Sequence, residues 1–170
     1  KSHSTCYAFV AYQTAYLKYH HPLAFMAALM TSVMGNQSKL ALYIQDCKEH
    51  GIKLLPPSVS HSKVGFTVEA GAIRYGLNAV KNVGRGAIEA IISARGNEGF
   101  KGFFDFCERV SASELNKKAV ESLIKAGAFD DLGHYRSQLL AIYEKTIDGM
   151  HAVKRKSVEG QFSIFNMPLS

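Results

Sequence analysis

Apolar and aromatic residues recur at helical spacing through most of the first fifty positions. Between Tyr7 and Lys18 they lie three and four residues apart, which predicts a helix. Pro22 suits the first position of a second helix that continues to Met34, because its missing N–H would have no partner there. Ser38 is expected to cap a third helix that Gly51 ends. The first section is therefore expected to be all helical.

The pattern changes after the third helix. Leu55-Pro56-Pro57 is expected to be extended, because a proline disfavours the helical region for the residue before it, and we place a domain boundary near residue 60. The alternation in 66–68 and 73–75 predicts a short hairpin, the only sheet expected. A tight glycine turn over 82–86 then joins two predicted helical segments, one over 76–81 and one over 87–95.

Helical patterns return in the second half. A short aromatic helix is expected from Phe103, and Asn116 is expected to cap another. A further amphipathic helix is predicted over Ser137–Ile147. Residues 151–159 are charged and nearly free of apolar side chains, which predicts a tether. The fold class is thus mainly α with one small β-hairpin.

The amino-acid composition indicates which class of partner the protein binds and in which cell compartment it is found. The 170 residues include 20 Lys and Arg against 14 Asp and Glu, a formal charge of +6 that suits a polyanionic partner. A hydrophobic fraction of 47% is typical of a globular core. Three cysteines far apart indicate reduced thiols. Without a long apolar run or a signal peptide, we expect a soluble, cytoplasmic protein and no membrane contact. Because the sequence opens without Met inside a helical pattern, we expect a piece of a longer protein.

The glycine turn is the clearest candidate for binding. Gly84 and Gly86 allow backbone angles and a close approach that a side chain would block, and Gly86 opens a helix whose first N–H groups lack partners. A phosphate would satisfy them, with Lys81, Arg85 and Arg95 supplying positive charge. Such contacts hold a nucleic-acid backbone without reading its sequence. The alternative is a simple turn between packed helices.

Two further segments have candidate roles. Gln161-Phe162-Ser163-Ile164-Phe165 has the form of a short linear motif whose Ile164 and Phe165 enter an apolar cleft, or it packs back onto its own core. Lys1-Ser2-His3 could hold a triphosphate or a sugar, although such a tripeptide is more often a helix cap. The motifs HExxH, GxxxxGK[ST] and GxSxG are absent from the sequence, as is a close Asp-x-Asp pair, so we expect no complete active site.

Taken together in order and spacing, these residues resemble the alpha subunits of bacterial DNA polymerase III, the replicative family C polymerases. The resemblance is nearly full length. The blocks that carry it are Lys1–Ser4, Ala11–Lys18, Pro22–Ala28, Leu55–Pro57, Tyr75–Gly84, Ala87–Ile92, Phe104–Cys107 and Leu123–Asp130.

The resemblance implies three parts: the late polymerase fingers in residues 1–60, a helix-hairpin-helix region for duplex DNA in 61–149, and a charged tether with a sliding-clamp-binding peptide in 150–170. It places Lys1, Ser2 and His3 beside the incoming nucleotide, with His3 excluding a ribose 2′-hydroxyl, and gives Gln161–Phe165 to the clamp. The residues expected to bind DNA are Lys81, Val83, Gly84, Arg85, Gly86 and Arg95.

The expected function is therefore DNA replication by a DNA-directed DNA polymerase, a nucleotidyltransferase whose segment here grips duplex DNA and reaches the sliding clamp, or beta subunit. Other replicase subunits are further expected partners. The family's catalytic aspartates and their magnesium lie outside these residues, so we expect no cofactor and no activity from this piece alone. One alternative is a stand-alone helix-hairpin-helix module of a repair protein. Another is a structural interaction domain whose basic charge is incidental.

Overall fold

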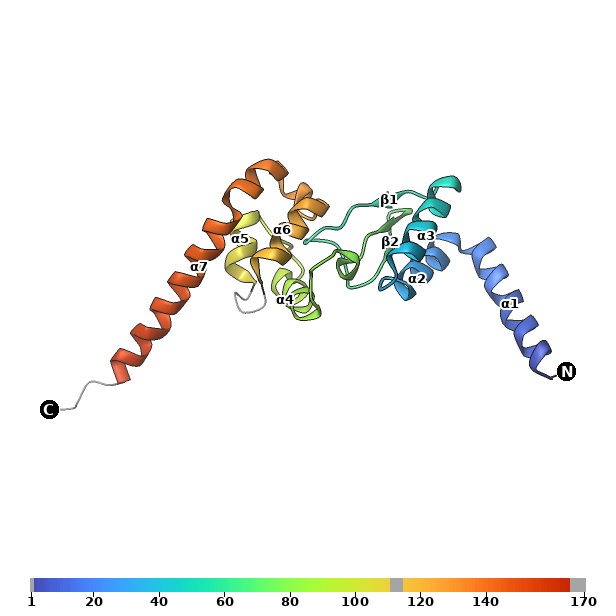
Figure 1. Cartoon of the computed structure of the whole chain (residues 1–170), viewed down its shortest axis with the longest axis horizontal. Coiled ribbons are helices and arrows are strands. Elements are labelled where there is room, and N and C mark those ends of the chain that lie inside the picture. The colour runs from blue at the N-terminus through green and yellow to red at the C-terminus, as the bar shows by residue number, and fades with distance from the viewer. Residues whose placement is uncertain (1, 111–114, 166–170) are drawn as a thin grey trace. The chain divides into compact units, whose positions relative to one another are not determined.

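The computed structural model describes residues 2–110 and 115–165 of the chain, and it is mainly helical with one small sheet. Two compact units are present (Figure 1). Unit 1 comprises residues 1–57 and 62–79, and unit 2 comprises residues 58–61 and 80–170. The expected fold class is confirmed, whereas the three predicted domains, divided at residues 60 and 149, stay a prediction.

Unit 1 begins with three successive helices, as expected: α1 (Ser2–His20), α2 (Pro22–Ser32) and α3 (Gln37–Glu49). Pro22 is the first residue of α2. The predicted cap of α3 was wrong by two residues, because the side chain of Asn36 accepts the hydrogen bond from the Lys39 N–H at 3.0 Å. Asn36 has the extended backbone that an N-cap needs, whereas Ser38 already lies inside the helix.

A three-stranded sheet packs in the same unit. The predicted hairpin is confirmed as β2 (Thr67–Glu69) paired antiparallel with β3 (Ala72–Arg74), and its two-residue turn puts Ala70 and Gly71 at positive φ. A third strand was not expected: β1 (Leu54–Leu55) pairs parallel with β3, so the strand order is β1-β3-β2. The extended backbone before the two prolines is what makes this pairing possible.

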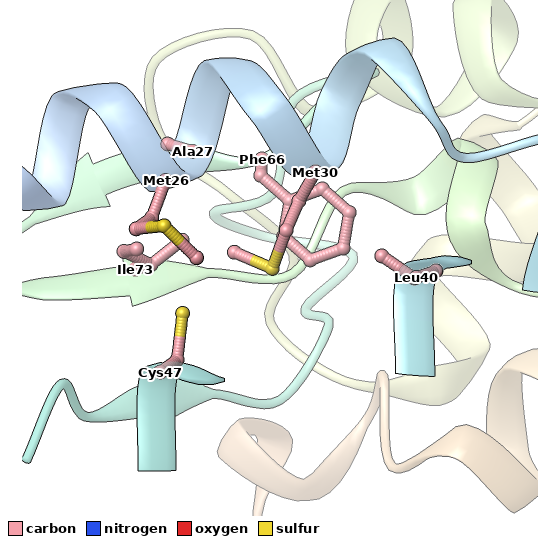
Figure 2. Close-up of a cluster of buried hydrophobic side chains, with 7 residues drawn as sticks. All are labelled: Met26, Ala27, Met30, Leu40, Cys47, Phe66 and Ile73. Atoms are coloured by element: carbon pink, nitrogen blue, oxygen red, sulfur yellow. The ribbon is translucent and has the colours of Figure 1, made fainter. Parts of the chain in front are cut away.

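The core of unit 1 lies between α2, α3 and the sheet (Figure 2). Met26 and Met30 of α2 are buried against Phe66 and Ile73. Thr31 adds a polar link, because its hydroxyl accepts the Phe66 N–H at 3.0 Å and donates to the Ala27 carbonyl at 2.7 Å. After β3, the chain makes a short 3₁₀ turn, η1 (Leu77–Ala79).

Unit 2 is built from helices. They are α4 (Arg85–Arg95), α5 (Phe103–Arg109), α6 (Lys117–Ala126), the 3₁₀ turn η2 (Asp130–Leu132) and α7 (Arg136–Phe165). The core contains an aromatic cluster in which Phe103 and Phe106 contact Phe129 edge-on, with ring centroids 5.3 and 4.9 Å apart. Asn116 caps α6 as predicted, accepting the Ala119 N–H at 2.7 Å.

The last helix is longer than the sequence pattern indicated. α7 continues through Gly149 to Phe165, so the predicted end at Ile147 was wrong and the backbone of the expected tether is helical. A single glycine costs only about 1 kcal/mol in a helix, and the lysines and arginines around it are good helix formers. The lack of apolar residues in the charged segment 151–159 was therefore not enough to predict that its backbone is extended.

Residues 58–61, which lie between two parts of unit 1 in the sequence, belong to unit 2. Val59 is fully buried; its N–H donates to the Ala128 carbonyl at 2.9 Å, and its own carbonyl accepts from Arg95 Nη1 at 3.2 Å. Ser58 Oγ donates to Asp131 Oδ2 at 2.6 Å. These bonds fix residues 58–61 against α4 and the η2 turn.

Candidate nucleic-acid interface

The turn that precedes α4 combines two buried anchors with an exposed edge. Val80 and Val83 are buried, whereas Lys81, Asn82 and Gly84 are exposed. The only helical residues directly before the turn are the three of η1, so the predicted first helix over residues 76–81 is a single 3₁₀ turn. The second helix is present as predicted, although it begins at Arg85 rather than Ala87.

The unusual backbone of this turn belongs to Asn82 and not to a glycine. Asn82 has a φ of +65°, the left-handed region that asparagine tolerates better than most side chains, and its Nδ2 donates to Ser122 Oγ of α6 at 3.0 Å. Gly84 has an ordinary φ of −74°, and nothing lies within 4 Å of the position of a Cβ there. The predicted need for glycine backbone angles at Gly84 was therefore wrong.

What Gly84 leaves open is the space outside the helix end. It is the N-cap of α4, and no side chain caps that end with a hydrogen bond. The first hydrogen bond of the i to i−4 helical pattern joins the Ile88 N–H to the Gly84 carbonyl at 3.1 Å. The preceding N–H groups at the start of α4 have no intrahelical acceptor, and Arg85 and Gly86 are exposed beside them. An anion can approach this end closely.

Positive charge at the turn comes from two side chains. Arg85 is 86% exposed, and its Nε donates to Glu89 Oε1 at 2.8 Å one helical turn away. Such an exposed pair contributes only about 0.3–0.5 kcal/mol, so a phosphate can compete for the guanidinium. Lys81 is exposed, and no ion pair of its side chain occurs in the described part of the chain. Both cations are therefore available at the open helix end.

Arg95 lies elsewhere, in the interior of unit 2. Its side chain is 9% exposed and donates to the Val59 carbonyl, and burial lowers the pKa of its guanidinium. A buried guanidinium bonded to its own backbone cannot reach a phosphate in solvent, so the expectation that Arg95 binds DNA is withdrawn. Arg95 instead holds the segment around Val59 against the end of α4.

The pattern in the sequence did not reveal the contact between the turn and α6. Asn82 contacts Ser122 on α6, and Lys118 lies one helical turn before Ser122 on the same side of that helix. Lys118 is exposed. No spacing within residues 80–86 signals this contact between the turn and α6.

The overall charge is not concentrated in the unit that carries the turn. Unit 1 has seven Lys and Arg against three Asp and Glu, whereas unit 2 has thirteen against eleven. The attraction for an anion near α4 therefore depends on the local arrangement of Lys81, Arg85 and the helix end.

Among residues 2–110 and 115–165, no group of three His, Cys, Asp or Glu side chains is placed to hold a metal ion. Burial raises the pKa of the Cys107 thiol to about 12, which keeps it protonated. None of the described helices is long and apolar enough to cross a membrane.

The other predicted site residues are only partly described. His3 is exposed in the first turn of α1, whereas Lys1 and the side chain of Ser2 lie outside the described residues. The backbone of Gln161–Phe165 forms the end of α7, and its five side chains lie outside the described part. The nucleotide-binding and clamp-binding roles of these residues stay predictions.

A protein-family model described as a helix-hairpin-helix motif matches residues 51–139, just over half of the chain and all of the turn before α4. The chain belongs to the helix-hairpin-helix family. Most of unit 2 as well as the sheet of unit 1 lies within the match.

Nearly the whole chain is also similar to bacterial DNA polymerase III alpha subunits, as the sequence blocks predicted. Identity is 44% over 166 residues with the Saccharopolyspora erythraea protein, 42% over 165 residues with that of Bacillus subtilis and 45% over 162 residues with that of Pseudomonas aeruginosa. These matches cover 97%, 97% and 94% of this chain and 14%, 15% and 14% of the respective relatives. The chain thus spans about one seventh of their length.

Proposed function

We propose that this chain is the part of a replicative DNA polymerase that holds duplex DNA by its backbone. The observation that carries the proposal is the uncapped, exposed start of α4 at Gly84, flanked by Lys81 and Arg85. A phosphate placed there accepts hydrogen bonds from the free N–H groups and meets the positive end of the helix dipole. Because these contacts reach no base edge, binding is independent of sequence.

The similarity to DNA polymerase III alpha subunits supports the replicative assignment over a stand-alone repair module. It covers 94–97% of the chain and so includes the helices before residue 51, which the helix-hairpin-helix model does not reach. In this proposal the longer protein is the DNA-directed DNA polymerase with its magnesium ions, and Lys1, Ser2 and His3 face its incoming nucleotide. Other replicase subunits are its further partners.

The decisive experiment compares DNA binding by the chain and by Lys81→Glu/Arg85→Glu. Fluorescence anisotropy with a labelled primer-template is measured across several salt concentrations. We expect the double substitution to weaken binding about tenfold or more. The slope of log affinity against log salt should fall by about 2, because neither substituted side chain can neutralise a phosphate. The matched control is Lys101→Glu/Lys145→Glu, which changes the net charge equally at exposed positions of unit 2 away from the turn.

A second variant tests the contribution of the start of α4 to DNA binding without changing the charge of the chain. Gly84→Ala adds a methyl group where the protein has open space and an ordinary φ, so the fold accepts it and the close approach of a phosphate is impaired. Reduced binding by Gly84→Ala and by the turn double variant, with the control unchanged, supports the proposal. Equal binding by all four proteins favours instead a structural domain whose basic charge is incidental.

We propose as a second function that Gln161–Phe165 docks on the sliding clamp. The support is the sequence pattern, a glutamine followed by Ile164 and Phe165 as apolar anchors. Binding to a ring that encircles DNA would raise the concentration of polymerase at the primer end. Since the backbone of this segment continues α7, an extended peptide would have to unwind the last helical turn.

The clamp proposal is tested by biolayer interferometry of the chain on an immobilised bacterial sliding clamp. We expect Ile164→Ala/Phe165→Ala to weaken binding at least tenfold, because a few buried apolar anchors carry most of the affinity of such peptides. Ile142→Ala/Phe104→Ala is the matched control, since it removes the same two side-chain types from exposed positions of unit 2. Equal losses in both variants would contradict a specific clamp peptide.

A further inference from the structure

Asn82 has an unusual backbone conformation for a residue with a side chain. Its φ of +65° lies in the left-handed region, and among the residues that the structure describes only Ala70 is another non-glycine with positive φ. Ala70 lies in the two-residue hairpin turn between β2 and β3, where such an angle is expected. Asn82 lies in no hairpin. A conformation of this kind persists when the surrounding structure holds it.

What holds Asn82 is a hydrogen bond to a helix far away in the sequence. Its Nδ2 donates to Ser122 Oγ of α6 at 3.0 Å, across forty positions of the chain. On either side of it, Val80 and Val83 are only 8% and 7% exposed and anchor the turn in the core of unit 2. Asn82 itself is exposed, so its side chain contributes little burial. The bond to α6 therefore acts mainly on the direction of the chain at this residue.

That direction determines how the start of α4 faces solvent. Asn82 is two residues before Gly84, the N-cap of α4, and the N–H groups that follow have no intrahelical acceptor. Without the bond to α6, Asn82 is free to move toward the commoner region of negative φ. A protein that is in its binding geometry for only a fraction of the time binds with an affinity reduced by that fraction.

We propose that Asn82 is a positioning residue of the DNA-binding turn, and that it acts through Ser122 of α6 without touching DNA. The inference rests on the proposed function, since it takes the start of α4 as the phosphate site. Lys81 and Arg85 meet the phosphate with their own charges. Asn82 and Ser122 carry no charge, so their loss lowers the affinity but leaves the number of ionic contacts, and hence the salt dependence, unchanged.

Fluorescence anisotropy with the same labelled primer-template tests this role in Ser122→Ala and Asn82→Gly. Ser122→Ala removes the acceptor and leaves every residue of the turn in place, whereas Asn82→Gly removes the amide and tolerates a positive φ. We expect each to weaken binding about three- to tenfold, the contribution of one hydrogen bond, with an unchanged slope of log affinity against log salt. Because both remove the same bond, the combined variant should bind no more weakly than the weaker single variant. Ser122→Thr keeps a hydroxyl and should bind like the unsubstituted chain.

The matched controls are Ser93→Ala and Asn97→Gly. They make the same changes at exposed positions in the last turn of α4 and just beyond it, at the opposite end of the helix from the turn. We expect both to bind DNA normally. Urea unfolding followed by far-UV circular dichroism verifies that all variants fold and measures any loss of stability.

Three results would overturn the inference. Normal binding by Ser122→Ala together with a loss in Asn82→Gly would show that Asn82 acts through its backbone or touches DNA itself. Normal binding by both variants would give their bond a purely structural role. Additive losses in the combined variant would show that the two residues act separately.

The double variant Lys81→Glu/Arg85→Glu, measured in the same assay, distinguishes this inference from the proposed function. If it loses binding whereas Ser122→Ala and Asn82→Gly do not, the phosphate site stands and only the positioning role fails. If the double variant binds normally, the proposed function fails and the positioning role fails with it.

Discussion

Phe103→Ala is expected to lower the free energy of unfolding of unit 2 by about 3–5 kcal/mol. Phe103 is 1% exposed, and its ring lies 6.4 Å from that of Phe106 and 5.3 Å from that of Phe129. Removing it empties a space that α5 and the loop after α6 cannot close without breaking the contacts of the other two rings. Urea unfolding followed by far-UV circular dichroism measures the loss.

The neighbouring residue provides the control. Phe104 is chemically identical and adjacent in α5 but 57% exposed, so Phe104→Ala is expected to change the unfolding free energy by no more than about 0.5 kcal/mol. Equal losses from the two substitutions would show that the aromatic cluster is not the core of this unit. The pair also defines a background for the DNA experiment, since Phe104→Ala should leave the turn before α4 unchanged.

The sequence was most informative at several positions where a local rule decided the structure. Pro22 at a helix start and Asn116 as a cap act through the next one to three residues, so both could be predicted. The hairpin over 67–74 depends on a two-residue turn that Gly71 permits. The same local chemistry identified the turn before α4 as a phosphate-binding candidate.

Three features were missed because contacts between distant residues decided the outcome. Strand β1 exists because β3 offers it a free edge nearly twenty residues later. Arginine is usually a surface residue, but the side chain of Arg95 donates a hydrogen bond to the Val59 carbonyl inside unit 2. Asn82 of the turn before α4 donates a hydrogen bond to Ser122 on α6, forty residues later in the sequence. Spacing along the chain contains no signal for these three features.

The sequence analysis also missed the close backbone contact at Gly76, which leaves no room for a side chain. Gly76 is buried where the chain leaves β3, and a Cβ there would lie 2.5 Å from the carbonyl carbon of Gly65 and 2.6 Å from the Val64 oxygen. The two backbones are held together by hydrogen bonds from Leu77 N to the Lys63 carbonyl at 2.9 Å and from Asn78 N to the Val64 carbonyl at 3.1 Å. Neither side can yield without losing these bonds.

Gly76→Ala is therefore expected to destabilise unit 1 by about 3 kcal/mol, the upper end of the usual cost of overpacking, because the clash is with backbone atoms. Gly35→Ala is the matched control: nothing lies within 4 Å of its Cβ position, and Gly35 is not among the glycines at positive φ. We expect that variant to be unchanged or more stable by about 0.5 kcal/mol. Hydrogen exchange distinguishes a local from a global effect. Faster exchange at the Leu77 and Asn78 amides in Gly76→Ala, with α6 unchanged, would confine the damage to unit 1, whereas native protection at both amides would contradict the predicted clash.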